Sequence, residues 1–193
     1  MNAPALLIFF DSAYLIALVA WIGAILFFSF GVAPIIFKVL PAESAARFVR
    51  VLFPRYYAWG AMCGAIALPA YLGAPLSFQE FRGPSVALQA LLILAGTLLM
   101  FYCGQSLTPA INAARDAGLD GKPRFDRLHR RSVRLNGAVL LIGLGLIVAF
   151  AARGGPRTSG IVEPSPAERA RLEDQQYDRL LKERARTDRL TPR

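Results

Sequence analysis

The chain has 193 residues, of which 55% are hydrophobic and 18% charged, and its mean hydropathy of +0.43 is too high for an ordinary soluble domain. Its formal net charge of +9 would suit a nucleic-acid-binding protein, but the cations are distributed between apolar stretches and do not form one basic domain. The composition therefore predicts an integral membrane protein that binds no nucleic acid.

Several stretches of the chain are apolar for about 20 residues, the length that a helix needs to cross a bilayer. We expect spanning helices over residues of about 12–37, 57–78, 85–110 and 128–152. The first stretch is predicted to span the membrane and not to act as a secretory signal, because no cations precede it and it carries Asp11. The expected fold is all-α: residues 1–152 form a four-helix transmembrane bundle with a short interfacial helix, and residues 153–193 form a charged tail.

The segment after the first span is predicted to be an interfacial helix over about 42–53. Small and apolar residues fall on one face of this helix, and Glu43, Arg47 and Arg50 fall on the other. Pro54 is expected to end it. The next polar and aromatic side chains are expected to form a belt where the second span enters the bilayer: Arg55, Tyr56, Tyr57 and Trp59.

The connections between the spans differ in charge. Cations are concentrated in the first and third connections, whereas the second holds only Arg82. The positive-inside rule then predicts that the first and third connections are cytoplasmic and that both termini are external. Arg153 and Arg157, just after the fourth span, count against this orientation. The basic connections are expected to contact anionic lipid headgroups.

Polar residues of the third and fourth spans form two stripes at similar depth. Gln105, Thr108 and Asn112 share one helical face, and Ser132 and Asn136 lie on the face of the fourth span opposite its arginines. If the stripes face each other, they form a polar pocket at the cytoplasmic mouth. The candidate pocket residues are Arg55, Tyr56, Gln105, Thr108, Asn112, Arg115, His129, Ser132 and Asn136. The alternative is that these side chains only form hydrogen bonds between helices.

Sulfur-containing residues are a weak candidate for a metal site. Cys63, Met100 and Cys103 are expected at a shared depth, and such soft ligands suit Cu(I). They are also ordinary core residues, so we predict no metal and no cofactor. His129 is the single histidine, so a haem would need a different second ligand or a dimer. Because the chain has no P-loop, HExxH, GxSxG or Rossmann motif, we predict no enzymatic activity and no catalytic residues.

Three blocks carry a resemblance to a known family: "GAILFFSFGVAPIIFKVLPAESAARFVRVLFPRYY", "LTPAINAARD" and "LHRRSVRLN". Together they resemble the bacterial membrane family called domain of unknown function 4149, whose relatives include transmembrane protein 205-like proteins. The resemblance covers about residues 10–150 and implies a four-helix protein of the bacterial plasma (inner) membrane without an established reaction. The positions that match the family's typical residues are Pro34, Phe37, Phe53, Pro54, Tyr56, Asn112, Arg115, His129, Ser132 and Asn136.

Three functions are compatible with these patterns. The first is a small transporter-like or accessory unit with a polar cytoplasmic mouth. The second is a soft-metal or haem-linked redox or resistance module. The third is a membrane scaffold that binds a protein partner, or a second copy of the chain, through the tail, which could form one solvated helix.

Overall fold

The computed structural model describes residues 3–153 together with Arg171 and Gln175, and these residues are helical apart from short turns. The helical elements are α1 (Ala3–Leu26), the π-helical segment η1 (Phe27–Val32), α2 (Ala33–Val39), α3 (Ala42–Ser77), the 3-10 turn η2 (Gln79–Phe81), α4 (Pro84–Tyr102), the π-helical segment η3 (Cys103–Leu107), α5 (Thr108–Asp116) and α6 (Gly118–Ala152). The predicted all-α bundle is confirmed. The predicted tail helix lies almost wholly outside the described residues.

Four continuous helical segments are long and apolar enough to cross a membrane: Pro4–Val39, Ala42–Ser77, Pro84–Asp116 and Gly118–Ala152. With 36 residues, α3 measures roughly 54 Å at 1.5 Å per residue. That length exceeds the hydrocarbon core of about 30 Å. Several turns of α3 therefore extend into the headgroup region or beyond it.

The helix boundaries correct two predictions. The expected break at Pro54 is wrong, because α3 continues through this residue and joins the predicted interfacial helix to the second span. The predicted spans also left a polar connection between about residues 110 and 128, and this prediction is wrong because that segment is helical. There, only Ala117 separates α5 from α6, and Pro123 lies inside α6.

Two glycines make this short connection possible. Gly118 has a φ of +64°, a left-handed conformation that favours glycine. A Cβ on Gly121 would lie 1.9 Å from the carbonyl oxygen of Ala114, so α5 and α6 approach closely. The polar segment that the sequence suggested as a loop is therefore a sharp corner between two helices.

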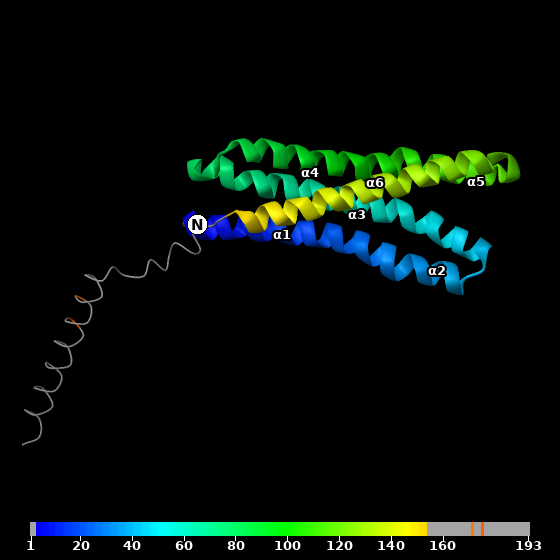
Figure 1. Cartoon of the computed structure of the whole chain (residues 1–193), viewed down its shortest axis with the longest axis horizontal. Coiled ribbons are helices and arrows are strands. Elements are labelled where there is room, and N and C mark those ends of the chain that lie inside the picture. The colour runs from blue at the N-terminus through cyan, green and yellow to red at the C-terminus, as the bar shows by residue number, and fades with distance from the viewer. Residues whose placement is uncertain (1–2, 154–170, 172–174, 176–193) are drawn as a thin grey trace, which may run out of the picture. The chain divides into compact units, whose positions relative to one another are not determined.

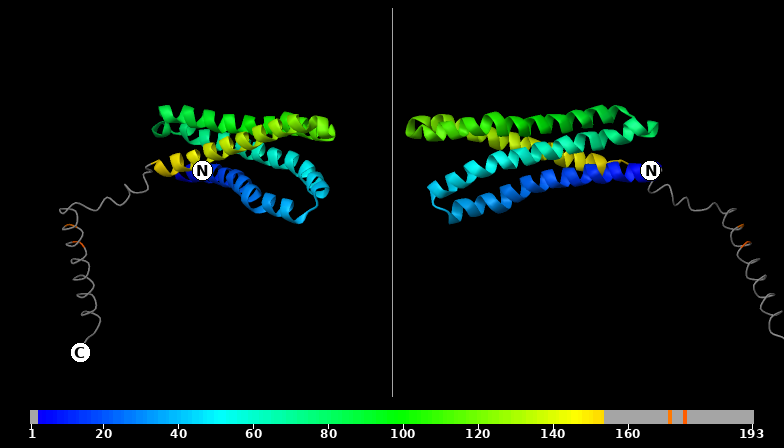
Figure 2. Two further views of the ribbon diagram at one scale, coloured as in Figure 1. Left: turned by 45° about the vertical axis from the view of Figure 1, so that its right-hand side comes forward. Right: turned by 180° about the vertical axis from the view of Figure 1, so that it is seen from behind.

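The four spans run antiparallel to their chain neighbours, and the start of α1 lies beside the end of α6 (Figure 1). α1 packs against α3 and α6, and α4 packs against α3 and α6. At the opposite end the bundle divides into two hairpins, α2 with α3 and α5 with α6, which diverge in every view (Figure 2). The molecule thus has a packed end near its N-terminus and a divided end at its basic connections.

The packed part is built around Trp21 of α1, which is 2% exposed. A Cβ on Gly96 would lie 2.8 Å from its ring, and a Cβ on Gly64 would lie 2.1 Å from the Thr97 hydroxyl oxygen and 3.1 Å from the same ring. Met100 fills the space above Gly60. Gly60 and Gly64, one helical turn apart on α3, thus allow close helix contact. Because glycines let the backbones of α3 and α4 come close, this part of the bundle contains little unfilled space.

Candidate functional site

A cavity of about 300 Å³ lies between the two diverging hairpins. One wall is mainly apolar and comes from η1, α2 and α3, with Phe28, Ser29, Ala33, Phe37, Val49, Phe53, Tyr56 and Tyr57. The other wall comes from α5 and α6 and holds most of the polar groups, with Thr108, Ile111, Asn112, Arg115, His129, Ser132, Val133 and Asn136. All four spans therefore contribute to one pocket with unlike walls.

Aromatic rings form the inner part of the α3 wall. The ring of Phe28 lies 5.2 Å from that of Phe53 and 5.3 Å from that of Tyr56. Phe53 also stacks on Tyr57 at 5.8 Å. Such contacts hold large side chains in fixed orientations, so this wall has a defined shape.

Two hydrogen bonds connect the walls. The Tyr56 hydroxyl donates to Asn136 Oδ1 at 2.8 Å, and the Tyr57 hydroxyl lies 2.8 Å from Ser132 Oγ, where either oxygen can donate. The predicted hydrogen bonding between helices is therefore present, with tyrosines of α3 as the partners. These bonds set the spacing of α3 and α6 where the pocket begins.

The two π-helical segments lie next to the pocket, and each precedes a proline. The amides of Ala33 and Thr108 bond to carbonyls five residues earlier, at Phe28 and Cys103. Pro34 and Pro109 follow directly; a proline has no amide hydrogen and its ring crowds the carbonyl four residues before it. A wider turn accommodates that ring, and such turns often occur at functional sites.

The α5 residues of the pocket differ in their hydrogen bonding. The Thr108 hydroxyl donates to the Cys103 carbonyl at 2.8 Å, so it is used within its own helix. Asn112 is half-buried and lines the cavity. No hydrogen bond of its side chain occurs within the described part of the chain. The Asn112 amide can therefore donate to and accept from a ligand.

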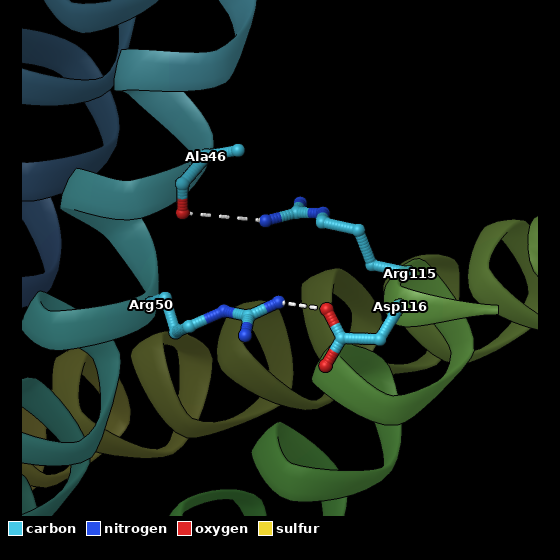
Figure 3. A network of polar contacts seen from close by, with 4 residues as sticks. All are labelled: Ala46, Arg50, Arg115 and Asp116. Atoms are coloured by element: carbon cyan, nitrogen blue, oxygen red, sulfur yellow. Dashed lines mark hydrogen bonds and ion pairs between the residues drawn. The ribbon is translucent and has the colours of Figure 1, made fainter. Parts of the chain in front are cut away.

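Polar contacts join α3 to the end of α5 beside the pocket (Figure 3). Arg50 forms an ion pair with Asp116, and Arg115 Nη1 donates to the Ala46 carbonyl at 3.5 Å. We call these two contacts the clasp. They hold the two hairpins together at the basic end of the molecule.

Arg115 and His129 share an aromatic neighbour. The Arg115 guanidinium lies 4.8 Å from the centroid of the Phe125 ring, and the His129 ring stacks on Phe125 at 5.7 Å with an interplanar angle of 2°. Both groups line the pocket, and among the described residues no carboxylate does. The site is therefore positive at the Arg115 guanidinium, with the His129 imidazole beside it.

The structure brings most of the predicted pocket residues together. Those that line the cavity are Tyr56, Thr108, Asn112, Arg115, His129, Ser132 and Asn136. Arg55 does not, because its side chain is exposed and donates to the Val51 carbonyl of its own helix. Gln105 is also exposed outside the pocket, because η3 changes the helical register between it and Thr108.

Sequence reasoning assigned the tyrosines of α3 to an aromatic belt. Instead, Tyr56 is 9% exposed and Tyr57 3%, and both turn into the bundle, while Arg55 and Trp59 stay outside. Tyr57, Phe28 and Phe53 were missed as pocket residues. The i, i+4 spacing of Phe53 and Tyr57 places them on one helical face, and it was the one available signal.

The sulfur-containing residues are buried in the packed part of the bundle. Cys63, Met100 and Cys103 are each 3% exposed or less, and both thiols are free. In the part of the chain that the structure describes, no group of three or more His, Cys, Asp or Glu residues could hold a metal ion. Met100 packs on Gly60, which gives it a role in the core.

Comparison with known proteins identifies one family. No curated protein and no solved structure matches the chain, whereas the family model described as "Domain of unknown function (DUF4149)" matches residues 16–120. The match includes the pocket residues from η1 to α5 and ends before His129, Ser132 and Asn136, so the third block of the resemblance lies outside it. By its four apolar helices and this match over more than half of its length, the chain is a membrane protein of the DUF4149 family.

Proposed function

We propose that the chain is a small transporter-like or accessory unit of the bacterial inner membrane, which binds a ligand in the pocket between its two hairpins. The pocket carries this proposal, because all four spans line it and it presents polar groups that the fold itself does not use. The Asn112 amide is one such group, and the Arg115 guanidinium, which donates to Ala46 through Nη1, has further N–H groups to offer. Pockets of this kind, apolar with a few convergent polar groups, are typical of small-molecule sites.

In the proposed orientation the pocket faces the cytoplasm. It lies at the end of the bundle that holds the basic connections, with Lys38, Arg124 and Arg127 among their cations. Cationic connections are retained in the cytoplasm. The transmembrane protein 205-like proteins are proposed relatives with the same arrangement.

We propose binding and not catalysis at this site. The Ser132 hydroxyl bonds to Tyr57, and the His129 ring stacks on Phe125. Nucleophilic catalysis uses a hydroxyl or thiol that is hydrogen-bonded to a base. The two side chains best suited to that chemistry have other partners here.

The test is an inventory, by mass spectrometry, of small molecules that copurify with the protein in mild detergent. The Asn112→Leu variant should lose the bound compound, and the Gln105→Leu variant should retain it, because Gln105 lies within η3 and outside the pocket. Equal retention by both variants, with both correctly folded, would contradict the proposal.

Orientation is tested separately by cysteine labelling in whole cells. Leu119, 89% exposed at the basic end, and Glu80, exposed at the opposite end, are suitable positions. A membrane-impermeant thiol reagent should label Glu80→Cys from outside, and Leu119→Cys only after the membrane is opened. The reverse pattern would place the pocket on the external side.

A further inference from the structure

The pocket opens sideways between α2 and α6. α2 packs on α3 and η1, and α6 packs on α1, α4, α5 and η3, but no backbone contact joins α2 to α6 in the described residues. The two helices diverge in Figures 1 and 2. Phe37 of α2 and Val133 of α6 line the cavity, yet they are 65% and 58% exposed. The opening is therefore edged by apolar side chains that face outward.

The residues next in sequence place this opening at the membrane surface. Lys38 follows Phe37, and Arg134 follows Val133. Apolar side chains that face outward from a spanning helix meet acyl chains, whereas Lys and Arg reach headgroups. The opening thus lies where the hydrocarbon core of the bilayer meets its headgroups.

Entry from water on the α3–α5 side is restricted by the clasp (Figure 3). The Arg50–Asp116 ion pair and the contact of Arg115 with Ala46 join α3 to α5 beside the cavity. Between α2 and α6 there is no corresponding contact among the described residues. The open path therefore leads to the bilayer.

The inner surface of the pocket has one apolar part and one positively charged part, which match the chain and the head of an anionic lipid. Phe28, Ala33 and Phe53 offer an apolar wall, while Asn112, Arg115 and His129 offer donors and positive charge with no carboxylate among the lining residues. A volume of about 300 Å³ is at the lower limit of ligand pockets. It suits a small head and the first part of a chain, and the rest of the chain would lie between α2 and α6.

We infer that the pocket binds a single-chain amphiphile with a small anionic head, held by Arg115 and Asn112, whose hydrocarbon chain leaves between Phe37 and Val133. This inference rests on the proposed function, because it names the class of ligand for the same pocket. Binding of this kind requires a ligand with both a negative charge and a long hydrocarbon chain. A small soluble anion lacks the chain, and a neutral lipid lacks the charge.

The test uses a photoreactive palmitate analogue and the wild-type protein in vesicles of neutral lipid. The label should attach to the peptides that contain Phe37 and Val133. Oleate should displace the label at about one-tenth of the concentration at which oleyl alcohol does, since a charge-assisted hydrogen bond contributes at least a tenfold difference in affinity. Octanoate and inorganic phosphate should displace it poorly, because they lack the long chain.

Variants locate the site. Arg115→Gln removes the charge and Ala33→Phe fills the apolar wall, and each should reduce specific labelling about tenfold. Arg127→Gln, on an exposed arginine of α6 outside the pocket, is the matched control and should label like the wild type. The competition experiment needs no variant, so it remains decisive if a variant fails to fold.

Two outcomes would overturn the inference and separate it from the proposed function. If phosphate or octanoate displaces the label as well as oleate does, the pocket binds a small anion; the proposed function then stands without a lipid ligand. If no competitor displaces the label and it spreads over all exposed faces, there is no amphiphile site. An empty copurification inventory in that case would remove the proposed function as well.

Discussion

The helices are held together by different contacts at the two ends of the bundle. At the packed end, Tyr14 contacts both Tyr71 and Phe150, at 5.4 and 5.6 Å between ring centroids, and glycines let the helices approach. At the divided end, two hydrogen bonds from tyrosines and the clasp connect hairpins that are otherwise apart. The difference indicates that apolar packing holds the fold, whereas polar contacts define the pocket.

The sharpest test of this difference compares the accessibility of thiols. A cysteine introduced as Asn112→Cys should react with a water-soluble maleimide at least about 100-fold faster than the native thiols, a difference of about 2.7 kcal/mol in apparent opening energy. Cys63 and Cys103 are 3% and 2% exposed and should react only after denaturation. Equal rates at the three positions would show that the two ends are equally open.

A second test overpacks the packed end. A Cβ on Gly96 would lie 2.8 Å from the ring of Trp21, so Gly96→Ala should lower the free energy of unfolding by about 1–3 kcal/mol. Gly145→Ala is the control, because nothing lies within 4 Å of a Cβ there. Thermal unfolding in detergent measures both. Similar stability of the two variants would contradict the close packing around Trp21.

A third test concerns the hydrogen bond between Tyr57 and Ser132. Tyr57→Phe and Ser132→Ala should each cost about 0.6–1.7 kcal/mol, as measured for hydrogen bonds between membrane helices. The double variant should cost clearly less than the sum of the single variants, since they remove the same bond. Strictly additive costs would show that the two hydroxyls do not interact.

The smallest effect is expected at the clasp. The side chains of Arg50 and Asp116 are 42% and 59% exposed, so Asp116→Asn should lower stability by less than about 1 kcal/mol, and high salt should reduce the difference. Glu43→Gln, which removes an ion pair within one helix, is the control.

The same two variants test whether the clasp restricts the pocket. Glu43→Gln should leave the labelling rate of Asn112→Cys unchanged, whereas Asp116→Asn should raise that rate. A rate that stays the same in Asp116→Asn would show that the clasp does not restrict the pocket.

Sequence patterns were sufficient for the number and order of the spans but not for their ends. Hydropathy predicts four helices because crossing hydrocarbon requires a continuous apolar stretch. The same reasoning expected Pro54 to end a helix and left the glycines after Asp116 in a connection between the third and fourth spans. Pro54 lies inside α3, and Gly118 forms a corner with a left-handed φ. Tertiary packing decides whether a proline or glycine ends a helix, and local sequence does not show that packing.

The candidate site shows the same division. Asn112, Ser132 and Asn136 were predicted because a uniform helix of 100° per residue puts them on the inner faces, and they do line the pocket. Gln105 was misplaced because η3 departs from that geometry. Tyr57 was missed because an aromatic residue near the end of a span can lie either in the interfacial aromatic belt or in the interior of the bundle. Only the three-dimensional contact with Ser132 distinguishes the two.

The corner at Gly118 has a mechanical consequence. One residue separates α5 from α6, and their backbones meet at Gly121. This close contact restricts any change in the angle between the two helices. On the other side, α2 buries only Ile36 and joins α3 through Leu40 and Pro41. We therefore expect a widening of the pocket that admits a bulkier ligand to displace α2, the helix that buries less of its surface, and not the α5–α6 corner.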